Sequence, residues 1–292
     1  MHQAKKPDSS NWADPVAYLR RALAQDHFTL YCQPIAALSG ALAYPMAEVL
    51  VRLREEENAL LPPGDFLPVL EHYGMLPELD RWVVREALRR LTAGAAIPRF
   101  AINLSAQTVA DPKFPDFVAR ELQVSGVKAD CVVFEIEESD ALAAPSSVRR
   151  LSAALGSLGA GVLIDGFGRV EEFMELLELP GLRFVKVHGS LTRNLAMKEA
   201  AAAKIQAILA LSAQLGIELI AECIEDEEVL ARLKAMNVRY AQGFGICVPQ
   251  PIDLISELPV LRAAAQRAGE SGRTQAMPRA NPMQATGAPW SS

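Results

Sequence analysis

The sequence predicts an α/β fold and, within that class, a (β/α)8 barrel. Eight short apolar runs alternate with longer segments whose apolar residues recur at i, i+3, i+4 and i+7. This alternation is typical of strands that are connected by helices. The eight runs lie within about 220 residues, a length that suits a barrel. Counting alone leaves an open, doubly wound sheet as the alternative.

The ends of the chain differ in composition from its middle. Residues 1–12 are polar, so we expect a flexible N-terminus there, followed by a barrel domain over 13–258. Asp14 and Pro15 predict the start of a helix over 15–25. From about residue 269 Gly, Pro, Ser and Ala dominate, so we expect 259–292 to hold the end of a C-terminal helix and a disordered tail.

Each apolar run of four to eight residues predicts a strand, because turn-forming residues bound it. The predicted strands cover residues 28–35, 46–53, 99–105, 131–139, 161–168, 183–189, 217–225 and 239–246. The helical period predicts helices over 79–91, 146–158, 201–216 and 226–236.

Composition excludes several classes of function. Half of the 292 residues are hydrophobic, which is ample for a sizeable core. A net charge of −6 and a pI near 5.4 offer no basic stripe, so we expect no nucleic-acid partner. The absence of a long apolar run and of a signal-like N-terminus predicts a cytoplasmic protein without a membrane partner. Four scattered cysteines without a CxxC pair predict reduced core residues.

Polar side chains follow six of the predicted strands. They are Asn103, Glu135, Asp165, Lys186, Glu222 and Gln242. In a barrel the carboxyl ends of the strands build one mouth, so these residues are expected to converge there. Carboxylates together with an amide and an ammonium are typical of a site for a divalent cation and a phosphate.

The ordered motifs of the chain resemble those of the EAL domain, the family of cyclic di-GMP phosphodiesterases and their degenerate relatives. The resemblance rests on "YCQPI", "AEVLVRL", "LPPGDFLPVLEHYGMLPELDRWVV", "NLS", "FEIEES", "IDGFG", "KVH", "AECIE" and "AQGF", and covers roughly residues 12–255. It implies a TIM-like barrel whose first strand is antiparallel to the others, with cyclic di-GMP extended across the mouth. In active members two Mg²⁺ or Mn²⁺ ions activate a water that opens one phosphodiester to give linear pGpG.

The resemblance also implies a role for individual residues. For the first metal it implies Glu48, Asn103, Glu135 and Asp165. For the catalytic water it implies Lys186 and Glu222. For contacts to the nucleotide it implies Gln33, Leu50, Arg52, Asp80, Asn103, Glu225 and Gln242. Arg52 suits a phosphate because its planar fork donates two hydrogen bonds, and Asp80 suits a guanine edge.

The departures from the family pattern lie in its catalytic half. Gly166 stands where D-D-F-G has its second Asp, a residue that a two-metal site needs. "GRVEEFMEL" replaces the family's G-T/A-G-Y-S-S-L loop, which in active members resembles a lid that couples metal binding to dimerisation. His188 replaces the Asp of K-I-D, and a hydrogen-bonded structural role is preferred for it over metal binding. Cys223 replaces a glycine, and Val49 replaces the signature alanine.

Three functions follow as hypotheses. The preferred one is a degenerate EAL domain that binds cyclic di-GMP as a receptor, with Mg²⁺ or Mn²⁺ at one site at most, and relays occupancy to a downstream protein through loop 166–176 or the C-terminal tail. The second is an active phosphodiesterase in which Asp165, Glu222 and a water cover for the absent Asp. The third is an interaction module that binds no nucleotide. Many EAL domains dimerise, so a homodimer stays open.

Overall fold

The computed structural model describes residues 12, 14–40, 42–54, 60–170 and 172–257. The chain divides into two units, 1–260 and 261–292, and the fold below is that of the first unit. The predicted flexible N-terminus, apart from Trp12, and the predicted C-terminal helix end and tail at 259–292 lie outside the described residues. None of the described helices is long and apolar enough to cross a membrane.

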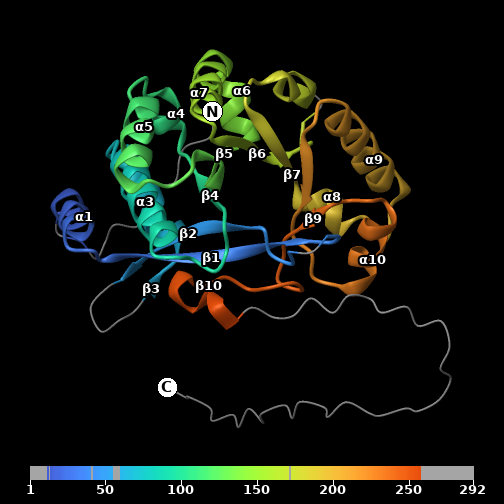
Figure 1. Cartoon of the computed structure of the whole chain (residues 1–292), viewed down its shortest axis with the longest axis horizontal. Helices are drawn as coiled ribbons and strands as arrows, with labels where there is room; N and C mark the ends of the chain where they lie inside the picture. The colour runs from blue at the N-terminus through green and yellow to red at the C-terminus, as the bar shows by residue number, and fades with distance from the viewer. Residues whose placement is uncertain (1–11, 13, 41, 55–59, 171, 258–292) are drawn as a thin grey trace, which may run out of the picture. The chain divides into compact units, whose positions relative to one another are not determined.

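Eight strands form a closed barrel (Figure 1). They are β1 (Phe28–Ala37), β2 (Met46–Arg54), β4 (Phe100–Asn103), β5 (Val132–Glu137), β6 (Gly161–Phe167), β7 (Leu182–Val187), β8 (Glu218–Ala221) and β9 (Tyr240–Ala241). β1 pairs with both β2 and β9, which closes the ring, and both pairings are antiparallel. The other pairings within the ring are parallel. The predicted barrel and its antiparallel first strand are therefore confirmed, and the open sheet is wrong.

Two short strands extend the sheet beyond the ring. β3 (Leu60–Leu61) pairs with the end of β2, and β10 (Gln250–Pro251) pairs with the middle of β1. Neither strand was predicted from the sequence. Two residues are too few to show an alternating pattern, so no periodic signal marks them.

Helices connect the parallel strands, because a parallel pair needs a long crossover. The α-helices are α1 (Pro15–Ala24), α2 (Pro63–His72), α3 (Leu76–Thr92), α4 (Ala106–Ala110), α5 (Phe114–Ser125), α6 (Glu138–Ala143), α7 (Pro145–Leu158), α8 (Gly189–Arg193), α9 (Glu199–Gln214) and α10 (Glu227–Ala235). Short 3-10 helices cover Ala129–Cys131, Glu172–Glu178 and Ile252–Glu257. As predicted, Asp14 caps α1, where its carboxylate accepts a hydrogen bond from the amide of Ala17.

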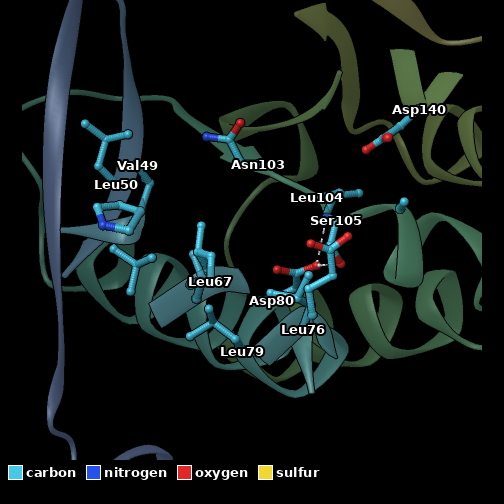
Figure 2. A pocket seen from close by; sticks show the side chains of 15 residues that line it. Val49, Leu50, Leu67, Leu76, Leu79, Asp80, Asn103, Leu104, Ser105 and Asp140 are labelled. Atoms are coloured by element: carbon cyan, nitrogen blue, oxygen red, sulfur yellow. Dashed lines mark hydrogen bonds between the residues drawn. The ribbon is translucent and has the colours of Figure 1, made fainter. Parts of the chain in front are cut away.

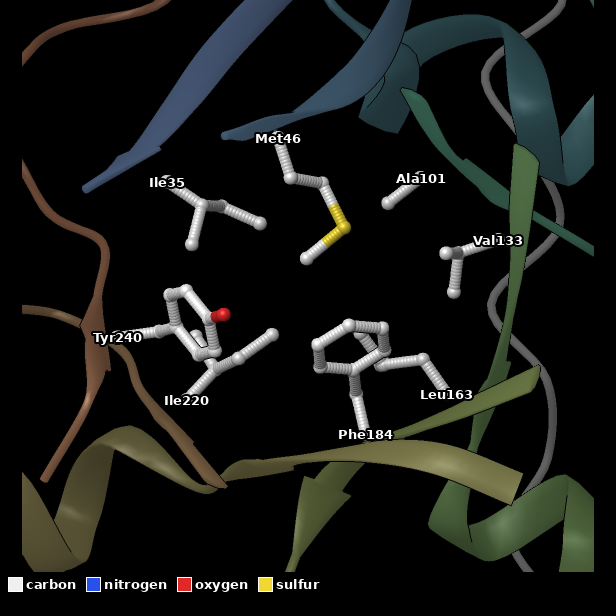
Figure 3. Packing of buried hydrophobic residues seen from close by; sticks show 8 residues of the cluster. All are labelled: Ile35, Met46, Ala101, Val133, Leu163, Phe184, Ile220 and Tyr240. Atoms are coloured by element: carbon white, nitrogen blue, oxygen red, sulfur yellow. The ribbon is translucent and has the colours of Figure 1, made fainter. Parts of the chain in front are cut away.

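One buried side chain from each strand closes the interior of the barrel (Figure 3). This layer consists of Ile35, Met46, Ala101, Val133, Leu163, Phe184, Ile220 and Tyr240. It mixes large and small residues, and the rings of Phe184 and Tyr240 meet edge to face with centroids 6.0 Å apart. We call it the closing layer. Because it fills the barrel, the residues that follow it along the strands rest on a packed floor.

Removing the largest apolar side chain of the closing layer tests this packing. Phe184 is 5% exposed, so Phe184→Ala leaves a cavity and is expected to lower the free energy of unfolding by about 3 kcal/mol. Urea denaturation measures the loss. Val124→Ala is the control, because Val124 is 79% exposed and its truncation is expected to change stability by less than about 0.5 kcal/mol. Equal effects of the two changes would contradict the packing described here.

Candidate functional site

A ring of polar side chains lies directly above the closing layer. Successive residues on one face of a strand are two positions apart, so each polar residue points to the same interior as the layer member of its strand. The ring consists of Gln33, Glu48, Asn103, Glu135, Asp165, Lys186, Glu222 and Gln242. Seven of these follow their layer residue by two positions, whereas Gln33 precedes Ile35 because β1 runs in the opposite direction. The structure therefore brings all eight predicted residues to one mouth.

Lys186 occupies the centre of the ring. Its ammonium nitrogen lies 2.8 Å from Oε2 of Glu135, 3.1 Å from Oε2 of Glu48 and 3.6 Å from Oδ1 of Asp165. Burial alone would favour the neutral amine, but the three carboxylates outweigh it and hold the pKa of Lys186 well above its usual value. Lys186 is therefore a buried, permanently charged ammonium.

Two amide side chains fix the carboxylate of Glu48. Asn103 donates to Oε1 at 3.0 Å, and Gln242 donates to Oε2 at 2.8 Å. Nε2 of Gln242 also donates to Oε1 of Gln33 at 3.2 Å. Nε2 of Gln33 donates in turn to the carbonyl oxygen of Cys247 at 3.0 Å. Burial would raise the pKa of Glu48, but the ammonium and these donors outweigh it and lower that pKa. Glu48 is thus an oriented, ionised carboxylate.

The mouth holds more carboxylate than positive charge. Burial, together with repulsion from Glu48 and Asp165, raises the pKa of Glu135 well above its usual value despite its contact with the ammonium. Burial and the nearby Asp165 likewise raise the pKa of Glu222 to about 7. One oxygen of Glu222 accepts a hydrogen bond of 2.6 Å from the amide of Gly189. The neighbouring carboxylates therefore favour uptake of a proton or another cation by Glu135 and Glu222.

The chemistry of this donor set suits Mg²⁺ or Mn²⁺. Both ions prefer carboxylate and amide oxygens, and Oε1 of Glu135 is buried without a hydrogen-bond partner. Within the described ranges, however, no three His, Cys, Asp or Glu side chains converge as ligands on one point. The ammonium of Lys186 lies among the carboxylates instead. The site thus has the ligand atoms for a divalent cation, arranged around an internal cation.

A row of side chains leads from the mouth along β2. Leu50 and Arg52 follow Glu48 at intervals of two and so share its face of the strand. The guanidinium carbon of Arg52 lies 5.4 Å from the ring centroid of Tyr31, and Nη1 donates to the carbonyl of Val51 at 2.8 Å. The row places an apolar side chain and then a guanidinium beside the mouth.

The larger of two cavities beside the mouth has a volume of about 400 Å³ (Figure 2). Leu50, Leu67 and Leu79 contribute apolar wall, and Asn103 of the ring also lines the cavity. Asp80 lines it too, but is only 7% exposed. Its Oδ2 accepts hydrogen bonds from the amide and hydroxyl of Ser105 and from the hydroxyl of Thr108, at 3.0, 2.7 and 2.6 Å. One oxygen of Asp80 is therefore already engaged within the wall.

The smaller cavity, of about 150 Å³, lies at the β1, β8 and β9 side of the mouth. Its lining is Gln33, Glu48, Glu222, Cys223, Glu225, Gln242, Gly243 and Phe244. Five of these are residues that the sequence singled out for metal, water or nucleotide. Apart from Arg52, the predicted nucleotide-contacting residues thus divide between the two cavities, of which Asn103 lines the larger and Glu48 the smaller.

The structure assigns local roles to two of the departures. His188 caps α8: its Nδ1 lies 2.8 Å from the hydroxyl of Ser190 and accepts from the amide of the same residue at 3.3 Å. This is the hydrogen-bonded structural role that the sequence favoured. Cys223 has a left-handed backbone, with φ of +57°, where the family pattern has glycine. Burial and the adjacent Glu222 raise its thiol pKa, which disfavours a reactive thiolate.

Sequence reasoning missed three residues at the ends of β5 and β6. Glu138 is 1% exposed and accepts hydrogen bonds from the amides of Gly168, Arg169 and Val170, at 2.7, 3.1 and 3.4 Å. It therefore anchors the start of the loop that departs from the family pattern. Glu137 and Arg169 form an ion pair with a distance of 3.6 Å. The only sequence signal for these residues was the acidic run "EIEES" after a buried strand.

Comparison with curated proteins finds relatives that include cyclic di-GMP phosphodiesterases. The chain is 30% identical over 249 residues to the cyclic di-GMP phosphodiesterase PdeB of Shewanella oneidensis, a match that covers 84% of this chain and 29% of that protein. It is 31% identical over 251 residues to the cyclic di-GMP phosphodiesterase PdeF of Escherichia coli, covering 85% of this chain and 33% of PdeF. The chain thus spans about a third of the length of these relatives.

Solved structures share the fold. The EAL domain of FimX from Pseudomonas aeruginosa, bound to c-di-GMP, matches with a TM-score of 0.76 and 25% identity over 82% of this chain and 97% of that one. The PaMucR phosphodiesterase in complex with c-di-GMP matches with a TM-score of 0.73 and 28% identity, covering 82% and 98%. The family model of the EAL domain matches residues 16–249. This chain belongs to the EAL domain family.

Proposed function

We propose that this chain binds cyclic di-GMP at the barrel mouth and acts as a receptor with little or no phosphodiesterase activity. The observation that carries the proposal is a mouth in which Glu48, Lys186 and Glu135 are joined by hydrogen bonds while position 166 bears no side chain. Related chains that are named phosphodiesterases, and a FimX domain that was solved with c-di-GMP, support the choice of ligand.

The shape of the mouth suits an extended cyclic dinucleotide. Such a ligand carries two bases and two phosphodiesters, and two cavities flank the ring of polar residues. Arg52 would donate two hydrogen bonds to a phosphate, and Leu50 would pack on a base. The other proposed contacts are Gln33, Asp80, Asn103, Glu225 and Gln242. Asp80 has one carboxylate oxygen engaged, so a guanine edge would use the other.

The same ring would hold one divalent cation. The proposed ligands are Glu48, Asn103, Glu135 and Asp165. Among their oxygen atoms, Oε1 of Glu135 is buried without a hydrogen-bond partner and so is open to a metal ion. The chemistry that Mg²⁺ or Mn²⁺ supplies in such a place is polarisation of a phosphodiester oxygen. Lys186 would hold the charge of the phosphate, and Glu222, with a pKa of about 7, would exchange a proton near neutral pH.

Gly166 is the reason to expect slow hydrolysis. A two-metal site needs carboxylates that both ions share, and a glycine supplies none. A loss of several kcal/mol of charge stabilisation corresponds to a rate roughly a thousandfold lower. The anchored loop after β6 is the surface through which occupancy would be passed to a partner protein, since Glu138 joins it to the end of β5.

An active phosphodiesterase is the second candidate. Lys186 donates hydrogen bonds to both Glu48 and Glu135, and Asp165 and Glu222 remain at the mouth. Sustained formation of pGpG in the presence of Mn²⁺ or Mg²⁺, lost in Glu48→Ala, would establish this function in place of the receptor.

Calorimetric titration with cyclic di-GMP tests the receptor. Wild type is expected to bind, and Arg52→Ala to bind about tenfold more weakly, because a charged hydrogen bond to phosphate contributes about 1.5–3 kcal/mol. Arg54→Ala is the matched control, since Arg54 is the exposed end of the same strand. Chromatography of the same samples is expected to find no pGpG. Absence of heat at ~100 µM ligand would end the proposal.

The raised pKa of Glu222 predicts a pH dependence of stability. Its carboxyl takes up a proton more readily in the folded chain (pKa about 7) than at its ordinary value of 4.5, so the free energy of unfolding falls as the pH rises between these values. Glu222→Gln should remove a fall on the order of 1–3 kcal/mol between about pH 5 and about pH 8, as measured by urea denaturation. Glu227→Gln, on α10, is the control. A variant with an unchanged pH profile would contradict the assignment.

A further inference from the structure

The carboxylate of Glu137 lies where a side chain at position 166 would begin. A Cβ on Gly166 would lie 2.9 Å from Oε1, 3.4 Å from Cδ and 3.5 Å from Oε2 of Glu137. Glu137 ends β5 and is the register partner of Asp165 on β6. The side chains at 137 and 166 therefore compete for one volume, and the sequence places the carboxylate on 137.

The positive charge that faces the carboxylate of Glu137 is an arginine side chain of this same chain. Nη2 of Arg169 lies 3.6 Å from Oε1 of Glu137. The backbone of Arg169 is held by Glu138, to which its amide donates at 3.1 Å, so the loop cannot move away without breaking buried hydrogen bonds. Burial, and then the charge of Arg169, lower the pKa of His188.

We propose that Glu137 and Arg169 form a built-in ion pair that takes the place of a second cation at the mouth. The carboxylate that Gly166 lacks is supplied by Glu137, and its partner is a guanidinium and not an exchangeable metal ion. The inference rests on the proposed binding of a cyclic dinucleotide and deepens it. Arg169 becomes a further group for the phosphodiester.

The geometry of Arg169 leaves it able to contact a phosphodiester while it is paired with Glu137. A guanidinium carries five N–H donors, and the contact with Glu137 uses one nitrogen. The side chain of Arg169 is 47% exposed, so its other donors are accessible. Because its charge does not depend on pH or on metal concentration, binding of the ligand should not require a second divalent ion.

Titrations of cyclic di-GMP in excess Mg²⁺ test the guanidinium. In excess Mg²⁺ wild type is expected to bind the nucleotide with no more than one Mg²⁺, and Arg169→Gln is expected to bind about tenfold more weakly than wild type. Arg149→Gln, an exposed arginine of α7, is the control. Arg169→Gln with wild-type affinity would overturn the proposal. So would a wild type that needs two Mg²⁺ ions for each bound nucleotide.

A second set of variants tests the shared volume without any nucleotide. Gly166→Asp should lower Tm by about 5 °C, because the new side chain meets Glu137 and because the backbone of Gly166 is left-handed with φ of +68°; Glu137→Thr added to it should restore only the part that the contact with Glu137 causes. Only the double variant is expected to gain uptake of Mn²⁺ in calorimetry beyond that of wild type. Additive changes in Tm would overturn the proposal, and so would a Mn²⁺ site in wild type that Glu137→Gln abolishes.

The two sets of experiments separate this inference from the proposed function. A wild type that gives no heat with cyclic di-GMP refutes the receptor and the role of Arg169 with it. The Tm and Mn²⁺ measurements still decide whether positions 137 and 166 exchange a carboxylate. If wild type binds the nucleotide, Arg169→Gln keeps wild-type affinity and the Tm changes at positions 137 and 166 are additive, the receptor stands and the ion pair is refuted.

Discussion

The two-residue repeat of the β-strand governs this mouth. Once the closing layer packs, each strand must present the residue two positions further along to the same interior, and eight polar side chains then meet above a dry floor. β1 obeys the same rule in reverse, which is why Gln33 precedes its layer residue Ile35. A shift of one residue in any strand would turn its polar group outward. The chemistry of the site therefore depends on apolar packing that touches no ligand.

Burial makes the charges of the mouth interdependent. Lys186 is 1% exposed, and removal of its charge would leave Glu48 and Glu135 uncompensated in a dry environment. The same ammonium competes for the carboxylate oxygens that a divalent cation would need. A mouth of this kind gains stability from its lysine and affinity for cations from its surplus of carboxylates. In the proposed receptor, the competition between the lysine and a metal ion for the same carboxylate oxygens would decide whether a bound phosphate is held or cleaved.

Periodicity explains what the sequence could predict. All eight ring strands were located from their apolar runs, and the polar residues at their ends converge because strand direction and the two-residue repeat are local properties. The strand β3, the engaged oxygen of Asp80 and the anchoring by Glu138 were not predicted. Each depends on which segments become neighbours in space: Asp80 is held by Ser105 and Thr108 from another helix, and Glu138 by a loop thirty residues away. Sequence spacing carries no such information.

The same limit explains why Gly166 could be misjudged from sequence alone. Comparison with the family motif shows only that position 166 lacks a carboxylate. The structure shows in addition that the carboxylate of Glu137 occupies the space where a side chain at position 166 would begin. The absence of a side chain at position 166 and the presence of an acid at position 137 are linked, because a Cβ at 166 would lie 2.9 Å from Oε1 of Glu137. In the proposed ion pair, the positive charge opposite the acid would differ in identity from that of a two-metal mouth. A tethered guanidinium can hold a phosphate, but it cannot activate a water as a metal ion does, so this exchange favours binding over turnover.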